Sequence, residues 1–146
     1  MPTHSYPFVQ STNEDGRILR LPAPYLPVRV TNPHSGKSIL TLALIDTGAD
    51  GCVFPSSLAE VLDHSFQGAG VHSEEVTGVS GCANVYKHTF NLELLAPNMQ
   101  DVFEVFTDVL VDCIDQQIPP LLGVCNCLRH FKITIDYLNQ ITSVSN

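Results

Sequence analysis

The chain has 146 residues, of which 44% are hydrophobic and only 15% are charged. This composition predicts one folded domain with its own hydrophobic core and argues against intrinsic disorder. The formal net charge is −8, and the chain has only seven lysines and arginines. Because so few cations cannot form a dominant basic patch, neither nucleic acids nor membrane surfaces are expected as partners.

No run of the chain approaches the ~18 apolar residues that a membrane-spanning helix needs. The first residues, MPTHSYPFVQSTNEDGR, have neither the basic start nor the apolar run of a signal peptide. The odd number of cysteines, five, then predicts free thiols in a reducing, cytoplasmic environment. Cys125 and Cys127 could form half of a metal site, but no second closely spaced pair exists. We therefore interpret them as small buried side chains.

In chain order, residues 1–24 contain four prolines among polar residues and are expected to form an irregular arm. The folded domain is expected over residues 25–146. Within it, residues 25–45 carry β-type residues on both sides of the turn-forming run Asn32-Pro33-His34-Ser35-Gly36-Lys37. This pattern predicts a hairpin whose second strand leads into Asp46.

The middle of the chain continues the β pattern. Val53 and Phe54 predict a short strand, and residues 55–62 predict a short helix that begins with a capping serine. Residues 71–95 predict two strands around the bend at 77–81, and residues 101–112 predict one strand or a pair.

The last third of the chain begins with Leu121-Leu122, which predicts a buried strand, and Gly123 allows a sharp turn after it. Residues 124–130 predict one or two helical turns. Residues 131–135 and 141–144 predict two final strands. The whole chain is therefore expected to be mostly β, with one or two short helices and no internal repeat.

The stretch LALIDTGADGCVF, residues 42–54, sends an apolar strand directly into an acid. A calcium-binding loop is not expected, because Gly48 and Ser57 stand where such a loop needs oxygen ligands. None of the six histidines lies in an H-E-x-x-H zinc motif, and no G-x-S-x-G serine motif is present. No cysteine has a recognisable activation signature, so a cysteine nucleophile stays open as an alternative. Asp46 is the candidate for acid-base chemistry.

Three stretches resemble motifs of the retropepsins, the retroviral-type, single-domain aspartic proteases. LALIDTGADGCVF resembles their active-site loop, TGVSG (77–81) their flap tip, and PPLLGVCNCL (119–128) their hydrophobic-hydrophobic-glycine segment. The three occur in the family's order and spacing and cover about residues 26–144. FKITIDYLNQITSV also resembles bacterial members. The resemblance implies a closed β-barrel with the acid protease fold. It also implies a hydrolase that cleaves peptide bonds without a metal or other cofactor.

A lone carboxylate is costly to bury at the end of a strand. Two close carboxylates cannot both ionise and so share one proton, as they do in aspartic proteases. The chain has only one Asp-Thr-Gly, so the second acid must be Asp46 of another copy in a homodimer. Two alternatives stay open: a non-catalytic module that dimerises or binds peptides, and a monomer that dimerises only at high concentration or on substrate.

The resemblance also assigns roles to residues around Asp46. It places the Thr47 hydroxyl in hydrogen bonds across the dimer axis and the Gly48 carbonyl near the substrate backbone. Gly78 and Gly81 would let the flap close over an extended peptide substrate. The residues expected to contact substrate are Leu44, Ala49, Asp50, Gly78, Val79 and Leu121.

One departure concerns the partner of Asp50. In the family, arginine followed by Asp or Asn often comes after the glycine of the late motif, and that arginine commonly pairs with the acid at this position. Here Val124 and Cys125 follow Gly123. Asp50 then needs solvent or another partner, and the candidates left open are Arg17, Arg29 and Arg129.

Overall fold

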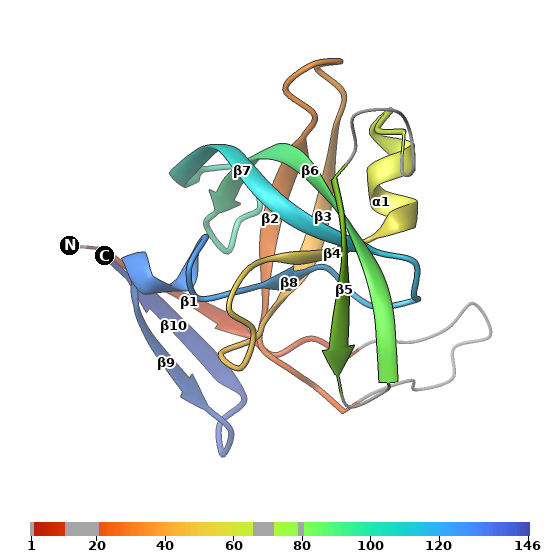
Figure 1. Cartoon of the computed structure of the whole chain (residues 1–146). Helices are drawn as coiled ribbons and strands as arrows, with labels where there is room; N and C mark the ends of the chain where they lie inside the picture. The colour runs from red at the N-terminus through yellow and green to blue at the C-terminus, as the bar shows by residue number, and fades with distance from the viewer. Residues whose placement is uncertain (1, 11–20, 66–71, 79–80) are drawn as a thin grey trace.

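The computed structural model describes residues 2–10, 21–65, 72–78 and 81–146 (Figure 1). Six strands close into a barrel in the order β2-β3-β8-β4-β7-β6, because β6 also pairs with β2. Their bounds are β2 Tyr25–Thr31, β3 Ser38–Ile45, β4 Val53–Pro55, β6 Gly81–Leu95, β7 Val102–Ile114 and β8 Leu121–Leu122. The predicted mostly-β closed barrel is confirmed.

The barrel forms because alternate residues along its strands are apolar and point inward. Val28 and Val30 of β2 are fully buried, as are Phe90 and Leu92 of β6. The Phe54 ring lies 5.3 Å from the Phe90 ring, measured between centroids. The core therefore occupies the barrel interior.

A hairpin extends from the barrel where β5 (His72–Gly78) pairs with the first half of β6. The pairing runs from His72 opposite Lys87 to Gly78 opposite Gly81. This is the predicted pair of strands around the glycine-rich bend. The segment over residues 101–112, for which one strand or two were expected, is the single strand β7.

A second sheet of three antiparallel strands has the order β1-β10-β9, with β1 Thr3–Pro7, β10 Ile141–Ser145 and β9 Lys132–Asp136. The expectation of an irregular arm does not hold for Thr3–Pro7, because this stretch pairs along its length with β10. Tyr6 is buried, and its hydroxyl donates a 2.7 Å hydrogen bond to the carbonyl of Leu95 in the barrel. Alternation of side chains over only five residues is too weak to predict a strand in a segment that also contains prolines.

The described part of the chain contains two short helical segments, α1 (Ser56–Val61) and a single 3₁₀ turn, η1 (Leu128–His130). The predicted serine cap of α1 is wrong. Pro55 occupies the N-cap position without a side-chain hydrogen bond. The Ser56 hydroxyl instead donates to a carboxylate oxygen of Asp115 at 3.2 Å. Within the described ranges, no helix combines the length and apolar character that crossing a membrane requires.

Candidate active site

Asp46 stands immediately after β3, at the point where the strand leaves the barrel core. Ile45 is buried and Asp46 is partly buried. The backbone N–H of Asp46 donates to the carbonyl of Leu122 at 3.1 Å, and the N–H of Leu44 donates to the carbonyl of Pro120 at 2.8 Å. Strand β8 thus fixes the last residues of β3 and the acid that follows them.

Strand β8 also holds the other end of the loop that carries Asp46. It runs parallel to β3, with Leu44 opposite Leu121, and antiparallel to β4, with Val53 opposite Leu121. We name residues 46–52 the acid loop. Both ends of this loop are therefore tied to the same two-residue strand, which restricts the positions that Asp46 can take.

The acid loop makes a tight turn around its own carboxylate. The N–H of Gly48 donates to Asp46 Oδ1 at 3.0 Å, and the N–H of Ala49 donates to the Asp46 carbonyl at 3.2 Å. Thr47 and Gly48 are exposed. Because one carboxylate oxygen is oriented by a backbone donor, the acid group has a defined direction at the surface of the barrel.

A second turn, residues 123–127, braces the acid loop from the side. The N–H of Val124 donates to the Ala49 carbonyl at 3.0 Å, and the N–H of Cys125 donates to the Asp50 carbonyl at 2.6 Å. A methyl group on Gly123 would lie 2.6 Å from the Gly51 Cα. Only glycine fits at Gly123, so the late glycine motif acts as a backbone packing site.

Asn126 is a site residue that the sequence analysis missed. Its side-chain Oδ1 accepts a 2.7 Å hydrogen bond from the backbone N–H of Cys52, 74 residues away. This bond closes the acid loop onto the 123–127 turn. Asparagine is common in turns and commonly bonds backbone groups, so its place three residues after Gly123 was the available signal.

The structure brings Leu44, Leu121 and Asp46 together, because the first two are direct strand partners beside the acid. Leu44 and Leu121 are both partly buried, as is Ala49 in the acid loop. Gly78 and Gly81 pair at the end of the β5–β6 hairpin. Val79 lies outside the described residues. Figure 1 shows this end of the hairpin and the loop between β3 and β4 at the lower end of the barrel.

Asp50 is exposed, and none of its atoms forms an ion pair within the part of the chain that the structure describes. Of the candidate partners, Arg29 instead lies 3.4 Å from Glu93. Arg129 is exposed. Arg17 lies outside the described residues. The backbone of Asp50 is held by Cys125, so this part of the acid loop is fixed through main-chain atoms.

The buried thiols of the barrel are unsuited to nucleophilic chemistry. Cys52 is buried, and burial raises the pKa of its thiol to about 11. Burial likewise raises the pKa of Cys127 and brings the pKa of Cys113 to about 12. A thiol with such a pKa stays protonated near neutral pH and is a poor nucleophile. The expectation of buried thiols is wrong for Cys125, which is exposed.

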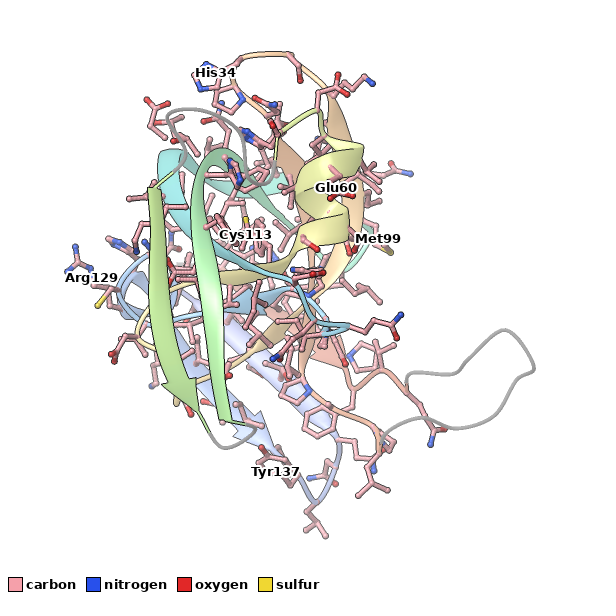
Figure 2. The ribbon with its side chains drawn as sticks, turned by 45° about the vertical axis from the view of Figure 1, so that its right-hand side comes forward. His34, Glu60, Met99, Cys113, Arg129 and Tyr137 are labelled. Atoms are coloured by element: carbon pink, nitrogen blue, oxygen red, sulfur yellow. The ribbon has the colours of Figure 1, made fainter. Side chains whose placement is uncertain are left out.

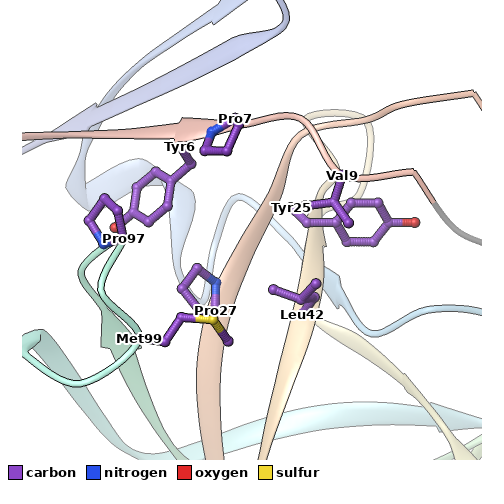
Figure 3. Close-up of a pocket in the computed structure, with 8 residues that line it drawn as sticks. All are labelled: Tyr6, Pro7, Val9, Tyr25, Pro27, Leu42, Pro97 and Met99. Carbon is purple, nitrogen blue, oxygen red and sulfur yellow. The ribbon is translucent and has the colours of Figure 1, made fainter.

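An apolar cavity of about 150 Å³ lies under β1 and does not include the acid (Figure 3). Its walls are Tyr6, Pro7, Val9, Tyr25, Pro27, Leu42, Pro97 and Met99. The cavity is lined by residues of both the terminal sheet and the barrel. It contains no titratable group other than two tyrosines, so it offers no acid-base chemistry of its own.

Comparison with known proteins supports the assignment of the fold. No family model matches the chain, and no curated protein matches its sequence. Among solved structures, a retropepsin-like aspartic protease from Rickettsia conorii superposes with a TM-score of 0.59 at 14% identity, covering 98% of both chains. The EIAV protease complexed with the inhibitor HBY-793 gives a TM-score of 0.50 at 16% identity, covering 77% of this chain and 88% of that one. The chain therefore has the retropepsin-like fold that its sequence motifs predicted.

Proposed function

We propose that the protein is an aspartic endopeptidase whose active site forms from the Asp46 carboxylates of two copies. The observation that carries this proposal is the position of Asp46. It is an acid at the end of a barrel strand, with its backbone fixed by β8 and one carboxylate oxygen fixed by Gly48. The similarity in fold to two proteases supports the same reading.

In the proposed reaction, the two carboxylates together hold one proton. The ionised Asp46 takes a proton from a water molecule as the water oxygen attacks the peptide carbonyl carbon. The protonated Asp46 of the other copy gives its proton to the carbonyl oxygen. The tetrahedral intermediate then collapses: one of its two hydroxyl groups gives its proton to the ionised Asp46, the C–N bond breaks, and the leaving amine takes the proton held by the other Asp46. Each turnover returns the pair to its starting charge.

The residues around Asp46 support the substrate in this proposal. Thr47 stabilises the pair across the two-fold axis, and the Gly48 carbonyl accepts a hydrogen bond from the peptide backbone. Ala49 and Asp50 contact the peptide further along, while Leu44 and Leu121 contact its apolar side chains. The β5–β6 hairpin, whose end carries the pair Gly78 and Gly81, covers an extended peptide and excludes water. Short unfolded segments of cytoplasmic proteins fit this description.

The test is cleavage of a peptide library by wild type and by Asp46→Asn, with sedimentation equilibrium on the same samples. Asp46→Asn should lower kcat/KM by at least about 100-fold, the usual contribution of a general acid or base. Asp108→Asn is the matched control. Asp108 is exposed with φ 53°, a conformation that asparagine tolerates.

The proposal is contradicted if Asp46→Asn cleaves peptides as fast as wild type. Cleavage should also be faster at mildly acidic pH than at alkaline pH, where the pair loses its shared proton. A dimer that cleaves no peptide at any pH would favour a non-catalytic binding module. Cleavage that appears only as the protein is concentrated would identify a monomer that is activated by dimerisation.

A further inference from the structure

The apolar cavity under β1 is a concave site apart from the acid loop. We name it the β1 cavity. Its walls come from the terminal sheet, from β2 and β3, and from the turn between β6 and β7, which contributes Met99. In Figure 2, Met99 lies on the right of the molecule, while Arg129, which follows the 123–127 turn beside the acid loop, lies on the left. A ligand in the β1 cavity would therefore leave Asp46 free.

We propose that the β1 cavity binds a small uncharged aromatic compound, a single six-membered ring with at most small apolar substituents. The cavity has a volume of about 150 Å³. Apolar cavities of about this size accept benzene-sized rings. This binding site goes beyond the proposed function and does not depend on it, because Asp46 does not line the cavity.

The polarity of the walls selects an uncharged ligand. The eight described side chains that line the cavity are all uncharged at neutral pH. The Tyr6 hydroxyl donates a 2.7 Å hydrogen bond to the Leu95 carbonyl. Figure 3 shows the Tyr25 hydroxyl pointing away from the other lining side chains. Because a charged ligand would lose its water without gaining a partner here, the cavity favours an apolar one.

The walls are also rigid, which keeps the cavity open. Pro7, Pro27 and Pro97 line it with fixed rings that have no side-chain freedom to lose. Tyr6 is buried and anchored through its hydroxyl. A ligand that fills such a cavity gains contacts at little cost in ordering the walls. The tyrosine rings favour an aromatic ligand, because aromatic pairs gain energy beyond the area that they bury.

Met99 adds a sulfur contact at the edge of the cavity. It has φ 60°, a conformation that methionine rarely adopts. The turn fixes this conformation. The N–H of Met99 donates to the Ala96 carbonyl at 2.8 Å, and Asn98 Oδ1 accepts from the N–H groups of Gln100 at 2.9 Å and Asp101 at 3.0 Å. Since a thioether makes favourable contacts with aromatic rings, the strained position of Met99 suits an aromatic ligand.

A free compound fits this site better than a ring carried by a peptide. The N–H and C=O groups of a peptide need hydrogen-bond partners when they leave water. The three prolines in the walls have no N–H to donate. The backbones of β2 and β3 are paired with each other from Tyr25 opposite Leu44 to Thr31 opposite Ser38. The walls therefore offer a peptide backbone few partners.

Titration with toluene tests the class of ligand. Isothermal titration calorimetry should show one toluene bound per chain, and the melting temperature should rise with toluene concentration. Benzoate has the same ring with a carboxylate and should bind about tenfold more weakly or less. N-acetylphenylalaninamide carries the ring on a peptide-like backbone and should also bind more weakly than toluene. Tighter binding of this amide would overturn the proposal of a free ring.

Filling the cavity tests the location of the bound ring. Leu42→Phe adds a larger side chain to the cavity wall and should weaken toluene binding about tenfold or more. Leu40→Phe is the matched control, because Leu40 lies two residues earlier on the same face of β3, is exposed and does not line the cavity. Its toluene Kd should match that of wild type.

Met99→Gly tests the site without overpacking. Glycine suits the φ of 60°, so this variant should unfold at a urea concentration no lower than wild type. It lacks the thioether and should still bind toluene more weakly. This combination separates a ligand contact from a merely structural role, and it decides the question if Leu42→Phe does not fold.

Two results would overturn the proposal. One is a wild-type protein that binds no toluene up to the solubility limit. The other is an equal toluene Kd for wild type and for folded Leu42→Phe and Met99→Gly, because the ring would then bind elsewhere. Weaker binding in these two variants, with Leu40→Phe unchanged, is the expected result. None of the measurements requires peptide cleavage, so a failure of the proposed function would leave them unaffected.

Discussion

Replacing Gly123 by alanine tests the contact that holds the acid loop. The new methyl group would lie 2.6 Å from the Gly51 Cα and against the Gly51 carbonyl group. Carbon atoms in contact are usually separated by ~3.5 Å or more, so the two backbones must move apart by about 1 Å. The obstacle is backbone on both sides, and no flexible side chain can move to relieve it.

Overpacking of this kind costs about 1–3 kcal/mol of unfolding free energy. The same movement would shift the 46–52 loop relative to β8, and a 1 Å displacement of a catalytic group can cost ~100-fold in rate. We therefore expect Gly123→Ala to lose both stability and kcat/KM. Urea denaturation measures the stability. Peptide cleavage, at a protein concentration high enough for the dimer to form fully, measures kcat/KM.

Gly36→Ala is the control, because a methyl group there meets nothing within 4 Å. Gly36 has φ 76°, so alanine should cost about 1 kcal/mol through backbone strain alone. Its cleavage rate should match wild type. If Gly123→Ala unfolds at the wild-type urea concentration, or loses stability while cleaving normally, the proposed bracing of the acid loop is refuted.

Three further predictions concern single side chains. Asn126→Ala should cost about 1–3 kcal/mol, because the Cys52 N–H loses its acceptor, while Asn126→Asp keeps the oxygen and should cost less; urea denaturation compares them. Thr142→Val should leave stability unchanged or raise the melting temperature, because the buried Thr142 hydroxyl has no hydrogen-bond partner among the described residues; a marked loss of stability would contradict this. Burial lowers the pKa of His64 from 6.5, despite the hydrogen bond to the Thr89 carbonyl, so the folded state accepts a proton less readily than the unfolded state. The stabilising contribution of neutral His64 should be full above about pH 6.5 and fall below it. In urea titrations at about pH 7.5 and about pH 5, His64→Gln should therefore lose less unfolding free energy than wild type. Equal losses would contradict the lowered pKa of His64.

The sequence by itself determined the barrel strands and the candidate acid. Alternation of apolar residues is a local property, so the strands around residues 25–45 and 81–95 follow from nearest neighbours along the chain. The Asp46-Thr47-Gly48 motif is equally local. Its position after the buried strand and the order of the two later motifs were enough to predict the retropepsin-like fold.

Only the tertiary structure decided which distant segments meet. The insertion of β8 between β3 and β4, the pairing of β1 with β10 and the bond from Asn126 to Cys52 all join segments far apart in sequence. A strand as short as β1 has too few alternating apolar and polar residues to be predicted from sequence. A polar side chain can bond any nearby backbone group. Partner choice therefore depends on the folded backbone, which places a particular donor within reach of a particular acceptor.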